Sequence, residues 1–190
     1  NPCGESPLYA NEACNLGSIN LSKMVKDGKF DFELLKDVTA VATRFLDSVI
    51  DVNHYPLPEI GEAVTLTRKI GLGVMGWADL LFQLLIPYDS DEALDLADQI
   101  MSTIQETSHS VSVALGKEKG IPASLEHLGR RNATLACIAP TGTIALLADC
   151  SSGIEPLFAL EHSRVRTQID GTKVVMKQAN RYYEKAMKNN

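Results

Sequence analysis

The sequence predicts an α/β fold with mainly parallel strands, because helical and extended segments alternate along the chain. Apolar residues recur at helical spacing over residues 31–49 and 91–115. A short apolar run at residues 134–139, between turn signals, is typical of a buried strand. The 190 residues are 45% apolar and 22% charged, a composition that suits a globular protein with a sizeable core.

The first half of the chain predicts one extended segment and three helices. Residues 12–25 read as a loop that enters a strand. Asp31 is the expected N-cap of the first helix. The apolar face of that helix is predicted to comprise Leu34, Val38, Val41, Phe45 and Val49. A proline-rich stretch at residues 55–58 then breaks the chain, and short helices are predicted near 60–68 and 77–85.

A long helix is predicted next. Asp89, with Glu92 three residues later, is its expected cap, and Gly116 or Gly120 is its expected end. Its apolar face is predicted to comprise Leu94, Ala97, Met101, Ile104, Val111 and Leu115. Further along, a turn at residues 140–143 opens a short helix, and a last, polar helix is expected over 177–188.

Charge and composition argue against several classes of protein. The net charge of -6, from 18 basic and 24 acidic residues, disfavours binding of a nucleic-acid polymer. A small phosphorylated ligand is still allowed, because backbone N–H groups can bind phosphate. We see no membrane-spanning stretch and no signal peptide, and expect a cytoplasmic protein. The chain begins at a motif without an initiator Met, so we expect a fragment or a processed piece.

Four cysteines are present: Cys3, Cys14, Cys137 and Cys150. No pair has the short spacing of a zinc site or a thioredoxin-like site, and we predict no metal site. A disulfide-stapled secreted domain would need more cysteines in a shorter chain. We therefore expect cytosolic thiols, with Cys137 and Cys150 in structural positions.

The opening pentapeptide, Asn1-Pro-Cys-Gly-Glu5, contains an amide, a thiol and a carboxylate, and its Pro and Gly suit a tight loop. Glu5 beside a substrate hydroxyl could act as a general base. Cys3 is a candidate nucleophile or radical carrier. Without a nearby His, thiolate activation is not evident, whereas one-electron chemistry needs no base. The alternative is a capped turn with a buried cysteine.

A glycine-rich run, Gly71-Leu-Gly-Val-Met-Gly76, matches the dinucleotide fingerprint G-x-G-x-x-G, and Asp91 lies twenty residues after its first glycine. Arg68 and Lys69 are poor residues for the end of a buried parallel strand, and the helix that follows is short. We favour glycines that allow close packing of backbone segments. A nicotinamide-binding fold is the alternative.

A second motif, Ala139-Pro-Thr-Gly-Thr-Ile144, runs from a predicted strand through a turn into a helix start. That geometry leaves unpaired N–H groups at the positive end of the helix dipole. Thr141 and Thr143 add hydroxyl groups. This is a plausible phosphate-binding turn without the Lys of a Walker A loop, and a simple N-cap is the alternative.

Together these motifs resemble the large chain of ribonucleotide reductases. Residues 1–5 and Glu12–Ser22 resemble its finger loop, and residues 68–76, 139–144 and 151–156 resemble later motifs in the same order. The spelling is most similar to the adenosylcobalamin-dependent class. The resemblance covers most of the chain to about residue 160. It implies a single catalytic-barrel fragment over residues 1–190, roughly the C-terminal half of a ten-stranded α/β barrel with the finger loop at its N-terminus. It also implies that the glycine run is a packing element.

The resemblance implies a role for each matched residue. Cys3 would become a thiyl radical that takes the 3′ hydrogen of the ribose, and Glu5 would take the proton of the 3′-hydroxyl. Asn1 would orient the ribose hydroxyls. Cys14 would be one of two cysteines that deliver reducing equivalents and close to a disulfide. The substrate phosphates would be held by Thr141, Gly142, Thr143 and Ile144.

The same resemblance implies several partners. An upstream part of the enzyme would bind adenosylcobalamin and supply the partner of Cys14, and a thioredoxin-like protein would provide reductant. We expect the chain to be inactive alone, and to take part in reducing ribonucleotides to 2′-deoxyribonucleotides once the missing N-terminal part is added. The alternatives are a non-catalytic nucleotide- or phosphate-binding module and, less favoured, an NAD-binding fold.

Overall fold

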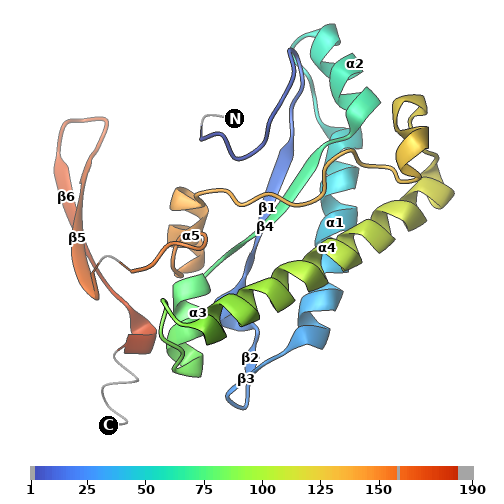
Figure 1. Ribbon diagram of the computed structural model, residues 1–190. Helices are drawn as coiled ribbons and strands as arrows, with labels where there is room; N and C mark the ends of the chain where they lie inside the picture. The colour runs from blue at the N-terminus through green and yellow to red at the C-terminus, as the bar shows by residue number, and fades with distance from the viewer. Residues whose placement is uncertain (1–2, 158, 184–190) are drawn as a thin grey trace.

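The computed structural model describes residues 3–157 and 159–183. Its centre is a parallel pair of strands, β1 (Asn15–Asn20) and β4 (Ile70–Met75), which are in register over all six residues. Every residue of β4 is buried. β4 consists of apolar residues and glycines, as a strand buried along its whole length should, whereas β1 also contains Asn15, Ser18 and Asn20. Figure 1 shows the two strands side by side.

The segment predicted as a strand at residues 134–139 lies along the other side of β4. Leu72 forms a parallel bridge with Ala136. The backbone N–H of Leu72 donates to Leu135, and that of Cys137 donates back to Leu72. The predicted buried strand is therefore present only as a single bridge residue, and Leu135 is the one residue of 134–139 that is buried.

Two long helices pack against one another, and one of them also packs on the strands. These are α1 (Phe32–Val52), which contacts both β1 and β4, and α4 (Asp91–Lys119). The remaining elements are η1 (Leu21–Lys23), β2 (Val25–Lys26), β3 (Lys29–Phe30), α2 (Pro58–Thr67), α3 (Trp77–Leu84), η2 (Ala123–Leu128), α5 (Gly142–Ala148), β5 (Glu161–Thr167) and β6 (Lys173–Ala179). No helix among the described residues has both the length and the apolarity needed to cross a membrane.

The sheets are mixed rather than mainly parallel. The pairs β2–β3 and β5–β6 are antiparallel hairpins, and the latter projects from the body of the molecule (Figure 1). The predicted polar helix over residues 177–188 is wrong at its start, because residues 177–179 complete the hairpin with residues 161–163. Residues 184–188 of that prediction lie outside the described part of the chain.

The two long helices begin at different kinds of cap. Asp31 caps α1 as predicted, its Oδ1 accepting from the N–H of Leu34 at 3.0 Å. The cap of α4 is Ser90, whose Oγ accepts from Ala93 at 3.2 Å. Asp89 is not the cap, because it lies within a turn closed by the bond from Ser90 N–H to the carbonyl of Pro87. The helix ends at Gly120, which has a φ of 87°.

The predicted apolar face of α1 is wrong. Val41 is 71% exposed and Phe45 is 65% exposed. The buried face consists of Leu35, Thr39, Thr43, Leu46, Asp47 and Ile50. The reason is that α1 approaches α4 through small polar side chains: the Thr43 hydroxyl donates to the Thr39 carbonyl at 2.8 Å and lies 3.3 Å from the Ser108 hydroxyl.

The side of α4 that faces α1 also buries small polar side chains. Ile104 and Leu115 are buried as predicted, but Leu94 is exposed. Ser108 and Ser112 occupy buried positions that apolar periodicity overlooks. Small side chains at a helix crossing let the backbones approach closely, and these two helices cross in that way.

Candidate active site

The chain opens in a tight turn that displays the first cysteine. The backbone N–H of Cys3 donates to Oε2 of Glu5 at 3.0 Å, and Gly4 has a φ of 75°. The turn is thus capped, as one prediction held, but Cys3 is exposed and not buried. Asn1, the third predicted catalytic residue of this motif, lies outside the described residues.

Lys69 ties the loop after this turn to the start of β4. Its Nζ donates to the Pro7 carbonyl at 3.2 Å and to Oε2 of Glu12 at 2.6 Å. The two paired side chains are only 10% and 5% exposed. Burial alone would raise the pKa of Glu12, but hydrogen bonds from Lys69 and the backbone of Tyr9 outweigh it and hold that pKa below its usual range. A lysine beside a buried strand, which looked unfavourable in the sequence, is therefore a paired anchor.

Cys14 lies at the start of β1 and is half-buried. Burial raises its pKa, and the charge of Glu5 acts in the same direction. Hydrogen bonds with Ser6 and Thr134 and the charge of Lys69 oppose this rise without cancelling it. The Cys14 thiol therefore keeps its proton to higher pH than an ordinary thiol.

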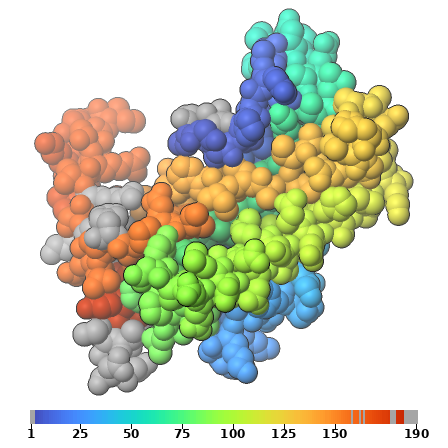
Figure 2. Space-filling view, in the orientation of Figure 1, coloured from blue at the N-terminus to red at the C-terminus, as the bar shows by residue number. Residues whose placement is uncertain are grey.

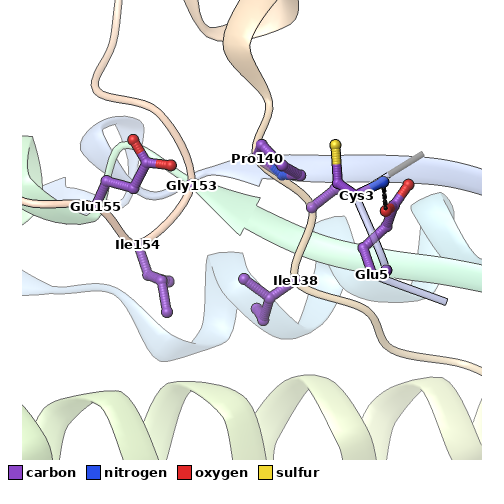
Figure 3. Close-up of a pocket in the computed structure, with 9 residues that line it drawn as sticks. Cys3, Glu5, Ile138, Pro140, Gly153, Ile154 and Glu155 are labelled. Carbon is purple, nitrogen blue, oxygen red and sulfur yellow. Dashed lines mark hydrogen bonds between the residues drawn. The ribbon is translucent and has the colours of Figure 1, made fainter. Parts of the chain in front are cut away.

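A cavity of about 310 Å³ lies beside the opening turn. Cys3 and Glu5 line one side, residues 153–155 line the other, and residues 138–140 lie between them (Figure 3). Glu155 stands across the cavity from Cys3 in this view. A pocket of this size, with a thiol and two carboxylates on its walls, suits one small polar ligand.

The predicted phosphate-binding turn adjoins this cavity. Among the described residues, none of 141–144 contributes to the cavity wall, but they continue directly from Pro140, which does. Thr141 is buried in a left-handed conformation (φ 56°), and its Oγ1 accepts from the Gly153 N–H at 2.6 Å. Residues 142–144 are exposed at the first turn of α5. Only part of the predicted set thus faces solvent.

Gly71 and Gly73 lie within the strand β4, and Gly76 alone of the three lies between that strand and α3. A Cβ on Gly73 would overlap the carbonyl oxygen of Cys137, and one on Gly71 would lie 2.8 Å from Cys137 Cβ. Gly76 caps α3 with a φ of 76°. The dinucleotide fingerprint requires its glycines after the strand, so the geometry supports the close-packing interpretation.

Two residues at this site were not predicted to take part. Cys137, expected to be only structural, donates from Sγ to the Glu5 carbonyl at 3.3 Å. Glu155 lines the cavity. The match of residues 151–156 to a later family motif was the sequence signal for Glu155, whereas spacing alone gave none for Cys137 because 132 residues separate it from Glu5.

Comparison with known families identifies the family of the chain. The family model "Ribonucleotide reductase, barrel domain" matches residues 1–127 and 121–190. The chain belongs to the ribonucleotide reductases. The family predicted from the opening and later motifs is thereby confirmed.

Curated relatives show which reductases the chain is similar to. It is 54% identical over 170 residues to the vitamin B12-dependent ribonucleoside-diphosphate reductase of Mycobacterium tuberculosis H37Rv, covering 86% of this chain and 24% of the relative. It is also 54% identical over 172 residues to the enzyme of that name from Thermoplasma acidophilum, covering 86% and 22%. This reductase chain thus spans about a quarter of the length of these relatives.

A solved structure supports the fold. The class Id ribonucleotide reductase alpha subunit of Actinobacillus ureae superposes with a TM-score of 0.73 at 30% identity, covering 93% of this chain and 31% of the other. The mixed helix and sheet arrangement of this ribonucleotide reductase chain is therefore a piece of the reductase barrel.

Proposed function

We propose that residues 1–190 form a single fragment of the catalytic barrel in a longer ribonucleotide reductase that makes 2′-deoxyribonucleotides by thiyl-radical chemistry. In this proposal the complete barrel has ten strands and the opening turn is its finger loop. The observation that carries the proposal is the shared cavity: an exposed thiol, Cys3, and the carboxylate of Glu5 line one wall of a space that fits a small polar ligand.

Cys3 and Glu5 act on the ribose in the proposed reaction. The sulfur of Cys3, as a thiyl radical, takes the 3′ hydrogen atom, and its S–H bond forms as the C–H bond breaks. Glu5 accepts the proton of the 3′-hydroxyl, which makes departure of the 2′-hydroxyl as water easier. The bond from the Cys3 N–H to the Glu5 carboxylate keeps the thiol and the base on one short turn. The amide of Asn1 would orient the ribose hydroxyls.

Cys14 supplies reducing equivalents together with a second thiol that we place outside these residues. The two thiols give up two electrons and two hydrogens: the C2′–O bond breaks, the hydroxyl leaves as water, a C2′–H bond forms, and a disulfide closes. Cys3 then returns the 3′ hydrogen to the ribose and becomes a thiyl radical again. Burial keeps Cys14 protonated, which suits a hydrogen donor. A thioredoxin-like protein would then reduce the disulfide. The unpaired state of all four cysteines suits a reducing compartment, and we place the enzyme in the cytoplasm.

The substrate phosphates are proposed to bind at the first turn of α5. The exposed backbone of Gly142, Thr143 and Ile144 offers N–H donors, and Thr143 adds its hydroxyl. Thr141 serves this turn indirectly, because its hydroxyl is occupied by the N–H of Gly153 in the cavity wall. A nucleotide placed this way would have its phosphates at α5 and its ribose at Cys3.

Adenosylcobalamin is the proposed radical source, on the strength of the relatives named vitamin B12-dependent. A cavity of about 310 Å³ is at the small end of ligand pockets and does not fit a corrin ring beside a nucleotide. We therefore place the cofactor on residues outside these 190. When bound it would supply the radical, and the described residues contribute the thiol that receives it.

Substitution of Cys3 tests the proposal in the longer chain with adenosylcobalamin and a thiol reductant. Cys3→Ser should abolish formation of deoxyribonucleotide while preserving binding of a ribonucleoside diphosphate, measured by titration calorimetry. Cys150→Ser, at a half-buried thiol outside the cavity wall, is the matched control and should stay active. Turnover by Cys3→Ser would contradict the proposal. Nucleotide binding without turnover by the unmodified enzyme would instead indicate a binding module.

A further inference from the structure

The glycines of β4 make room for the backbone of Cys137. No side chain fits at Gly73, because its Cβ would overlap the Cys137 carbonyl oxygen. At Gly71 a Cβ would lie 2.7 Å from Leu16 Cδ2 and 2.8 Å from Cys137 Cβ. These two positions therefore let the segment around Cys137 lie directly against the strand. This packing fixes the position of the Cys137 backbone, from which its side chain extends.

Because the backbone of Cys137 packs against β4, the Cys137 thiol contacts the opening turn. Its Sγ donates to the carbonyl of Glu5 at 3.3 Å, across 132 residues of sequence. In Figure 2 the opening residues lie directly on the band formed by the segment that contains residues 133–141. Burial raises the pKa of the Cys137 thiol, and Cys14 and Glu5 add to the rise. The group thus keeps its proton and remains a donor.

We propose that Cys137 is a positioning residue, whose hydrogen bond to the Glu5 carbonyl fixes the position of the Cys3–Glu5 turn relative to the cavity. This inference rests on the proposed function, in which Cys3 and Glu5 do the chemistry. The turn is otherwise fastened on its far side by the bonds from Lys69 to Pro7 and Glu12. Among the described side chains, that of Cys137 bonds to Glu5 from outside the turn. Residues 138–140, which follow Cys137 in the chain, line the cavity, so this bond joins the turn to the cavity wall.

A positioning role and a packing role predict different results for a conservative substitution: only in a positioning role does a residue that keeps the hydrogen-bond donor restore activity. Cys137→Ala removes the donor, and Cys137→Ser keeps a donor of similar size. A small displacement of the reacting groups lowers the rate of the chemical step. In the longer chain, Cys137→Ala should lower kcat about tenfold with KM for the ribonucleotide within about twofold. Cys137→Ser should recover most of the lost kcat.

The control is Cys150→Ala, which removes another half-buried thiol that does not line the cavity. It should leave kcat unchanged. Equal losses in Cys137→Ala and Cys137→Ser, or a loss that merely follows a lower melting temperature, would overturn the inference. So would an unchanged kcat in Cys137→Ala.

A second readout does not depend on turnover. The rate at which iodoacetamide alkylates Cys3, followed by mass spectrometry of its peptide, reports how the turn is held. Cys137→Ala should change that rate at least about threefold relative to both the unmodified enzyme and Cys137→Ser. An unchanged rate would overturn the inference even if Cys3→Ser had already refuted the proposed reaction, so the two failures are distinguishable.

Discussion

Replacing Asp47 with Asn should strongly destabilise the chain, because the Asp47 side chain is fully buried between two arginines. Its Oδ1 accepts from Arg68 Nε and from Asn132 Nδ2, each at 3.0 Å, and its Oδ2 lies 3.1 Å from Arg131 Nε. Burial alone would raise the pKa of Asp47, but the hydrogen bonds from Asn132 and Arg68 and the two guanidinium charges hold it below its usual range.

The expected loss follows from what an amide would do at that position. It removes the negative charge and turns one acceptor oxygen into a donor that faces a guanidinium group. Breaking a buried ion pair by removing one partner costs roughly 3–5 kcal/mol. Asp51 remains 2.8 Å from Arg68 Nη1 and offsets part of the loss, so we expect about 3 kcal/mol for Asp47→Asn. For a chain of this size, that corresponds to a fall in Tm of roughly 6–12 °C.

Urea unfolding followed by far-UV circular dichroism measures the effect, with the denaturant slope checked for constancy. Asp51→Asn is the matched control, because Asp51 contacts the same arginine but is 42% exposed. It should cost less than about 1 kcal/mol. A smaller loss for Asp47→Asn than for Asp51→Asn would refute the reasoning.

Two further predictions concern the strand β4 and its anchor. Gly73→Ala should cost about 3 kcal/mol or more, since a methyl group would overlap the backbone of Cys137. Gly142→Ala, where nothing lies within 4 Å, should leave Tm nearly unchanged, and equal effects would argue against the close-packing role. Because Lys69 lowers the pKa of Glu12, their pair stabilises the chain above about pH 4.3, the unfolded value, and the contribution is lost as pH falls through the folded value. Glu12→Gln should therefore be less stable than the unmodified chain at neutral pH and equally stable in acid; a constant difference in urea midpoints across that range would contradict this.

The sequence predicted the elements of this fold better than their buried faces. Asp31 as the cap of α1 follows from local chemistry, because a capping side chain bonds to N–H groups within three residues. The buried face of α1 depends on what lies opposite. Thr43 is buried because Ser108 of α4 meets it, and Asp47 because two arginines enclose it. Apolar periodicity has no means of detecting either partner.

The candidate site was predictable to the extent that it consists of short motifs. The turn that contains Cys3 and Glu5, and the turn before α5, could be predicted because each lies within a few consecutive residues. The contact of Cys137 with Glu5 could not, since it depends on the strand order that places residues 134–138 beside β4. Nor could the engagement of the Thr141 hydroxyl with Gly153, which removes one group from the predicted phosphate ligands.

The five residues from Cys137 to Thr141 have a consequence for how the site responds to its ligand. At one end the Cys137 thiol bonds to the turn whose sulfur is proposed to carry the radical, and at the other the chain enters the turn proposed for phosphate. This connection is short, and Pro140 fixes one of its backbone angles, so its backbone has little flexibility. Binding of the phosphates at α5 would therefore also affect the position of the Cys3 sulfur relative to the ribose. In a nucleoside without phosphate, that sulfur would be less well aligned with the ribose.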